Sequence, residues 1–161
     1  MIVVSDASPL IALATIGELG LLRRLYDEIV VPEAVYREVA STRPSAPGAA
    51  EFRAASWVRT HAVQNRLLVN ALSLQLDVGE AEAIALAVEL NAELLLIDER
   101  RGRTAATRLG RRVVGVLGAL VEAKQRKFVL EVRPLLDRLA VDAGFRISPE
   151  LRARVMETAG E

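Results

Sequence analysis

Residues 77–103, DVGEAEAIALAVELNAELLLIDERRGR, constrain the fold of this chain more than any other stretch. The pattern predicts a buried helix that opens on Glu80, a tight turn near Asn91–Ala92 and a buried strand that ends on Asp98. The strand, LLLI, is the most continuous apolar run in the chain. A strand without alternation is typical of a parallel sheet whose two faces are both covered by helices.

The rest of the chain alternates further short strands with helices. Apolar or alternating runs predict strands at residues 2–5, 28–31, 57–63 and 112–116, the third of them at a sheet edge. Ser8 and Pro9 predict the N-cap and first position of a helix that runs to about Ile16, and Pro32 predicts the start of another helix. Further helices are expected at residues 21–28, 65–75, 101–109, 118–127, 132–142 and 149–158, and the Pro/Ser/Gly-rich residues 41–50 are expected to form a surface loop.

This order of elements predicts an α/β domain with a parallel sheet. Right-handed crossovers and one reversal of the chain place the first and fourth strands side by side. Ligands bind such sheets beyond the carboxyl ends of the strands at that switch point. Asp6 and Asp98 occupy those two strand ends, so we expect them to meet at one crevice.

Composition limits the chemistry and the partners of the chain. The 161 residues predict one domain with an aliphatic core, since 52% are hydrophobic and only 4% aromatic. Twenty-one acidic residues balance 21 basic residues, so any attraction to nucleic acid must be local. The absence of cysteine excludes disulfides and thiolate chemistry. No signal-peptide pattern and no uncharged apolar run of about 20 residues occurs, which favours a soluble cytoplasmic protein with no membrane span.

Four acids, each at the end of a strand or near the apolar face of a helix, form the candidate site: Asp6, Glu38, Glu80 and Asp98. Helical phase separates Glu80 from Glu82, because Glu82 shares its face with Glu89 and that face is expected to be the wetter one. Glu38 adjoins the inward position Val39 and is expected at the edge of the core face.

Each acid also has a structural explanation. Asp6 and Asp98 suit helix N-caps or turns. Glu80 in the first turn of a helix complements the helix dipole, and a glutamate within a helix, such as Glu38, is usually exposed to solvent. As a set, however, clustered carboxylates raise each other's pKa and require protons or cations. Oxygen ligands without cysteine favour Mg²⁺ or Mn²⁺, which activate water for attack on phosphorus.

Six arginines follow the last of these acids within residues 100–112. These arginines are expected either to lie on a solvated surface or to form a patch that binds a phosphate backbone. Arg100 and Arg103 are closest in sequence to Asp98 and are therefore the best candidates to bind substrate. Ser8 is expected to cap its helix or else to orient the first acid or a water. His61, the only histidine, is interpreted as structural. No phosphate-binding glycine loop, nucleophile elbow or HExxH motif occurs.

Several segments resemble the PIN-domain superfamily, and more closely its bacterial and archaeal branch related to VapC-type toxin ribonucleases. They are VVSDASPLIAL (3–13), VVPEAVYREV (30–39), GEAEAIALA (79–87) followed by Asp98, and RISPELRARVME (146–157). The resemblance implies a three-layer α/β/α sandwich with a five-stranded parallel sheet in the order 3-2-1-4-5. A single PIN-like domain is expected over residues 1–161, with a C-terminal helical extension from about residue 131.

The family's acidic quartet falls on Asp6, Glu38, Glu80 and Asp98, as catalytic ligands of Mg²⁺ or Mn²⁺. The resemblance implies a dimeric endoribonuclease that acts on single-stranded or structured RNA, as the toxin of a type II toxin–antitoxin module with an antitoxin protein as partner. Three departures stand out: Leu96 stands where many toxin relatives have Ser or Thr, the third acid is Glu80 where aspartate is common, and the C-terminal helical tail exceeds the minimal domain. Two alternatives therefore stay open, namely a PIN-like scaffold that binds RNA or protein without cleavage and a small-molecule phosphohydrolase.

Overall fold

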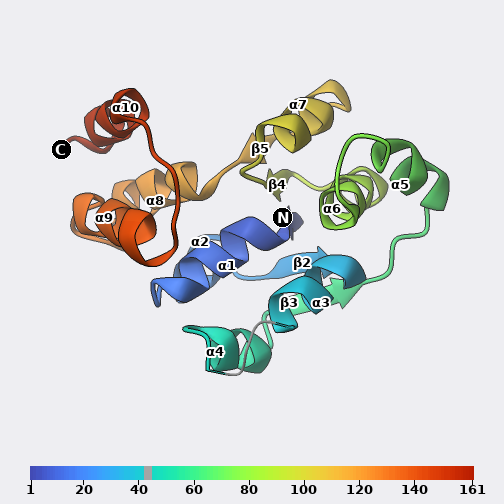
Figure 1. The fold of residues 1–161 in the computed structure, drawn as a ribbon, viewed down its shortest axis with the longest axis horizontal. Helices are drawn as coiled ribbons and strands as arrows, with labels where there is room; N and C mark the ends of the chain where they lie inside the picture. Colours follow the sequence, from blue (N-terminus) through green and yellow to red (C-terminus); the bar gives the residue numbers. More distant parts are fainter. Residues whose placement is uncertain (42–44) are drawn as a thin grey trace.

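The computed structural model describes residues 1–41 and 45–161 and is built on a five-stranded parallel sheet in the order β3-β2-β1-β4-β5. Its strands are β1 (Val3–Ser5), β2 (Ile29–Pro32), β3 (Val58–His61), β4 (Leu94–Leu96) and β5 (Val113–Val114). Helices flank this sheet (Figure 1), so the predicted three-layer α/β/α sandwich and its strand order are confirmed.

The strands β1 and β4 lie side by side, as the switch-point argument requires. Val4 pairs with Leu95 and Ser5 pairs with Leu96. Beyond the ends of the strands, the N–H of Asp6 donates to the carbonyl of Leu96 at 2.9 Å. Both strands are buried along their whole length, as expected of central parallel strands covered on both faces. Their carboxyl ends therefore reach the same edge of the sheet.

Within the described residues, the helices connect these strands and extend beyond the last one. They are α1 (Ala7–Thr15), α2 (Gly20–Tyr26), α3 (Glu33–Ala40), α4 (Ala49–Ala54), α5 (Arg66–Leu72), α6 (Val78–Glu89), α7 (Arg100–Arg108), α8 (Val116–Gln125), α9 (Arg133–Asp142) and α10 (Pro149–Ala159). The turn predicted after α6 is confirmed, because Asn91 adopts a left-handed conformation with φ of 48°.

Two helices begin differently from the sequence prediction. The helix α1 starts at Ala7 with Asp6 in the N-cap position, so the prediction that Ser8 caps this helix is wrong. Pro9 permits the earlier start because N–H groups in the first turn have no intrahelical partner, and a proline there loses no hydrogen bond. Pro32 ends β2 and precedes α3 instead of opening it.

The loop predicted at residues 41–50 is only partly confirmed. Residues 42–44 lie outside the described residues, and the helix α4 already begins at Ala49. This short helix is anchored by Phe52, which is buried and whose ring centroid lies 5.3 Å from that of Tyr36. A six-residue helix is too short for a clear apolar period, so the sequence pattern did not separate it from the loop.

The interpretation of Glu82 as part of a wetter face is also wrong. Its side chain is buried, with Oε1 accepting the N–H of Ala34 at 3.3 Å and Oε2 pairing with Arg66 at 3.1 Å. Glu89 on the same face accepts the N–H groups before α5. The helices α3 and α5 therefore cover the face of α6 that carries Glu82 and Glu89. The sequence had predicted that this face is open to water.

The C-terminal helices α9 and α10 belong to the main hydrophobic cluster. Leu136 and Leu139 of α9 are fully buried, and Met156 of α10 is nearly so. An ion pair of 2.7 Å joins Arg152 of α10 to Asp137 of α9. The extension is thus packed against the α/β core, and Figure 1 shows α8, α9 and α10 grouped at one end of the molecule. Among the helices described, none has the length and the apolar character needed to cross a membrane.

Candidate functional site

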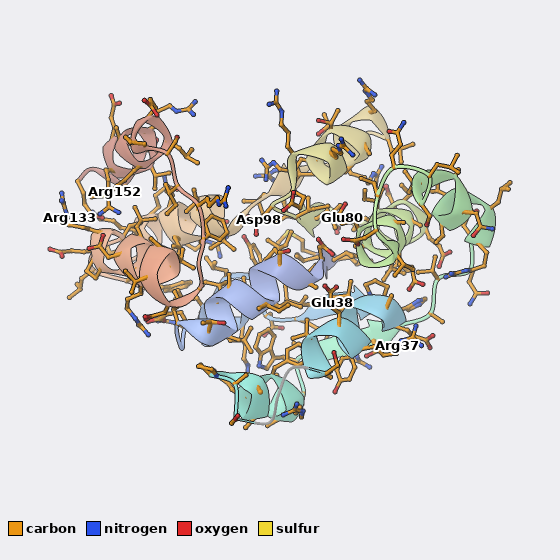
Figure 2. All side chains as sticks on the ribbon, in the orientation of Figure 1. Arg37, Glu38, Glu80, Asp98, Arg133 and Arg152 are labelled. Atoms are coloured by element: carbon orange, nitrogen blue, oxygen red, sulfur yellow. The ribbon has the colours of Figure 1, made fainter. Side chains whose placement is uncertain are left out.

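The four predicted acids come from four separate elements and approach one another at the carboxyl edge of the sheet. Asp6 follows β1 and Asp98 lies just beyond β4. Glu38 lies on α3, and Glu80 lies in the first turn of α6. Figure 2 shows Glu38, Glu80 and Asp98 around the middle of the molecule, near the start of α1.

Three carboxylates lie close to Gly79. A Cβ atom at this position would lie 3.2 Å from Oε2 of Glu38, 3.5 Å from Oδ1 of Asp77 and 3.7 Å from Oδ1 of Asp6. Oxygen atoms from α3, from the residue before α6 and from the end of β1 therefore surround a space that glycine leaves open. Asp6 and Glu38, two of the four predicted acids, therefore lie near the same glycine.

Asp77 is a fifth carboxylate of the site that the sequence analysis missed. It occupies the N-cap position of α6, where its Oδ1 accepts the N–H of Glu80 at 2.8 Å. The available signal was the D-x-x-E spacing of a capping box, which fixes both side chains at the same helix start. That spacing explains Asp77 structurally, so nothing in the sequence alone pointed to its second position beside Asp6 and Glu38.

Asp98 is held by the start of α8. Its Oδ1 accepts the N–H of Val116, the first residue of that helix, at 2.8 Å. The contact is so close that a Cβ atom on Gly115 would lie 2.6 Å from the same oxygen. The other oxygen, Oδ2, is buried and has no hydrogen-bond partner in the described part of the chain. A buried carboxylate oxygen without a partner is costly, so this atom is suited to bind a cation.

Burial and mutual repulsion make the charged form of this cluster unfavourable. Burial raises the pKa of Asp6 to about 7, and the N–H of Ala7 opposes this effect while Asp77 and other acids add to it. Burial also raises the pKa of Glu80 to about 7, with further repulsion from Asp77 and Asp6. Near neutral pH the two groups therefore need a positive charge or a proton nearby.

The other two acids are affected in the same direction. Burial, and then repulsion from Asp77, raises the pKa of Glu38. Burial raises the pKa of Asp98, whereas the N–H of Val116 and the charge of Arg103 act against that increase. Arg103 is fixed in place because its Nη1 donates to the carbonyl of Ile97 at 2.9 Å. One guanidinium therefore lies beside the cluster of acids.

The remaining predicted residues are placed less centrally. Arg100 is exposed at the start of α7, with no ion pair among the residues described. Ser8 is exposed in the first turn of α1 and lines the groove that contains Asp98. His61 is exposed at the end of β3, where its Nδ1 contacts the carbonyl of Ala62 at 2.9 Å. Ser8 and Asp98 therefore line the same groove.

The donor set fits a hard divalent cation in its chemistry. All candidate ligands are carboxylate oxygens, and Oδ2 of Asp98 is a buried acceptor without a partner in the described chain. Within residues 1–41 and 45–161, however, no three acidic or histidine side chains are yet arranged around one ion position. Ion binding therefore requires the side chains to turn toward one another from their present orientations. Solvent reaches the cluster from two sides, through a cavity of about 450 Å³ at Glu38 and Asp77 and a larger groove at Asp98.

These features define an α/β domain with an acidic centre at the switch point of its parallel sheet. The family model DUF3368, described as a PIN domain, matches residues 2–161. The chain therefore belongs to this PIN-domain family. PIN domains are generally nucleases, which makes a nuclease-type hydrolase the class of this fold. No curated protein and no solved structure matches the chain.

Proposed function

We propose that this chain is a Mg²⁺- or Mn²⁺-dependent endoribonuclease. The observation that carries the proposal is the buried, unpartnered Oδ2 of Asp98 in the described chain, at the edge of the sheet where Asp6 and the other carboxylates gather. Family membership supports a nuclease, and a set of oxygen donors supports these ions over zinc.

The residues divide into two roles in this proposal. Asp6, Glu38, Glu80 and Asp98 hold the ion or ions, and Asp77 fixes the start of the helix that carries Glu80, because its Oδ1 accepts the backbone N–H of Glu80. The chemistry supplied by a bound divalent ion is activation of water and neutralisation of charge on the phosphate. Arg103, fixed on the carbonyl of Ile97, binds a phosphate oxygen next to the acids.

Substituting the two strand-end aspartates tests this function. We expect Asp6→Asn and Asp98→Asn each to lower Mn²⁺-dependent cleavage of a single-stranded RNA by more than about 100-fold, since even outer-shell partners of metal ligands are worth about 10–100-fold. Thermal unfolding checks that both variants are folded, and Glu157→Gln on the exposed face of α10 is the control. Wild-type rates in both aspartate variants would rule out this mechanism.

A catalytically inactive scaffold that binds RNA or protein is the competing function. It is favoured by one observation, namely that no three ligands in the described residues already surround an ion position. Purified wild-type protein that binds RNA but leaves it intact in Mn²⁺ and in Mg²⁺ would establish the scaffold instead.

We further propose that the nuclease acts in the cytoplasm as a dimeric toxin neutralised by an antitoxin protein. The support is the resemblance of VVSDASPLIAL and GEAEAIALA to VapC-type toxins. Induced expression in bacteria is expected to arrest growth with the wild-type chain and not with Asp98→Asn. Normal growth at equal protein levels would exclude the toxin role without affecting the nuclease proposal.

A further inference from the structure

A groove of about 1250 Å³ leads from Asp98 to the C-terminal extension. Part of its lining is apolar and includes Val114, Leu117 and Val121. Figure 1 shows α7 and α10 on opposite sides of this region, with β5 and α8 between them. The volume exceeds the range of about 300–1000 Å³ that is usual for a small-molecule pocket, so the groove has room for a longer ligand.

Arginines from separate parts of the chain line both walls. Arg103 and Arg112 come from α7 and the residue before β5, and Arg146 and Arg154 come from the C-terminal extension. The side chains of Arg112, Arg146 and Arg154 have no ion pair or hydrogen bond with any residue that the structure describes, and all three residues are exposed. In a chain with zero net charge, this gathering is a local concentration of uncompensated positive charge.

Neighbouring arginines of the extension differ in this respect. Arg152 pairs with Asp137 at 2.7 Å, and Arg138 lies 3.9 Å from Asp142 and also donates to the carbonyl of Ile16. Both guanidinium groups are therefore already engaged in contacts within the protein. The acids in the groove do not cancel its arginines either, because Glu122 is already paired with Arg126 at 2.7 Å, and Asp98 and Glu99 lie at the acidic end.

Phe145 adds an aromatic surface to the wall formed by the extension. It is half-buried, lines the groove and directly precedes Arg146. An aromatic ring next to cationic side chains and an apolar lining is suited to unpaired bases, which stack on the ring while arginines bind the phosphates. A base-paired duplex keeps its bases stacked inside and would leave this apolar surface unused.

We propose that the groove binds a single-stranded stretch of RNA and guides it to the acidic cluster, with Arg112, Arg146 and Arg154 on the phosphates and Phe145 against a base. The C-terminal extension thereby becomes part of the substrate site and not only a packing element. The cleavage half of this inference rests on the proposed nuclease function. The binding half stands by itself, because the groove and its charges do not involve an ion.

Binding of a 12-nucleotide, fluorescein-labelled single-stranded RNA, measured by anisotropy in EDTA, tests the groove. We expect the Arg146→Ala/Arg154→Ala double variant to bind at least about tenfold more weakly than wild type. The slope of log Kd against log salt concentration should fall by about 1.4, because each of the two lost phosphate contacts with a single strand accounts for about 0.7. Phe145→Leu should also weaken binding by about tenfold.

Arg133→Ala is the matched control, since Arg133 is exposed at the start of α9, outside the groove lining, and Figure 2 shows it at the outer margin of the molecule. It should bind as wild type does.

Equal affinity and equal salt dependence in the double variant would overturn the inference, as would a duplex RNA that binds as tightly through the same arginines. If wild type cleaves RNA and the double variant binds and cleaves equally well, the groove fails and the nuclease stands. If RNA binding needs these arginines but nothing is cleaved, the groove stands and the nuclease fails.

Discussion

The carboxylate of Asp6 is buried at a cost to the stability of the protein. Only 3% of its surface is exposed, and burial raises its pKa to about 7. A folded-state pKa above the unfolded value means that the native protein binds more protons than the unfolded chain between about pH 4 and pH 7. The stability of the metal-free protein therefore decreases as the pH rises through this window. If Asp6 binds an ion as proposed, the bound ion would offset this cost.

Replacing this carboxylate with a neutral side chain should stabilise the metal-free protein. We expect Asp6→Asn to raise the free energy of unfolding at pH 8 by up to about 4 kcal/mol, because each pKa unit corresponds to about 1.4 kcal/mol. The gain should shrink as the pH falls toward 4, where Asp6 of the wild type is protonated. Chemical denaturation in EDTA at both pH values measures the effect. A destabilised variant at pH 8 would contradict the cost assigned to Asp6, and Glu157→Gln serves as the exposed control.

The start of α8 is the element that positions Asp98. The helix offers its first N–H to Oδ1, and Gly115 allows the approach because it has no side chain. Negative charge is favourable at a helix N-terminus, which offsets part of the cost of burying this aspartate. The same contact leaves Oδ2 free for another ligand.

A methyl group at Gly115 should displace Asp98. In Gly115→Ala, the new Cβ would lie 2.6 Å from Oδ1 of Asp98 and 3.2 Å from Nη1 of Arg103, so both side chains must move. We expect at least about a tenfold loss of Mn²⁺-dependent cleavage, with a stability loss of about 1–3 kcal/mol from overpacking. Gly20→Ala is the control, since nothing lies within 4 Å of a Cβ there. Undiminished cleavage in Gly115→Ala would show that this contact does not position Asp98.

Elements with a strong local pattern were predictable from the sequence. The apolar runs of β1 and β4 and the turn at Asn91 fixed the switch point and, with it, Asp6 and Asp98 at one edge. Residues whose environment depends on distant elements were not. Glu82 is buried because α3 and α5 supply its partners, and Asp77 has a local capping role that conceals its position beside the acids.

In the whole molecule, the acids at the edge of the sheet and the groove lined by arginines lie next to each other, although their residues are far apart in the sequence. The sheet order brings the acids together, and the packing of α10 against the core brings Arg146 and Arg154 to the groove that starts at Asp98. No periodicity links these arginines to the acids, so the sequence pointed to Arg100 and Arg103 as candidate phosphate contacts and gave no reason to consider the arginines of the extension. The fold therefore concentrates positive charge locally in a chain that has no net charge.

Calorimetric titration of the metal-free protein with Mn²⁺ measures whether the carboxylates at the ends of β1 and β4 form a metal site. The wild type is expected to bind Mn²⁺ saturably, and Asp98→Asn is expected to bind at least about tenfold more weakly. The absence of saturable binding to the wild type, or equal affinity in Asp98→Asn, would contradict the metal site.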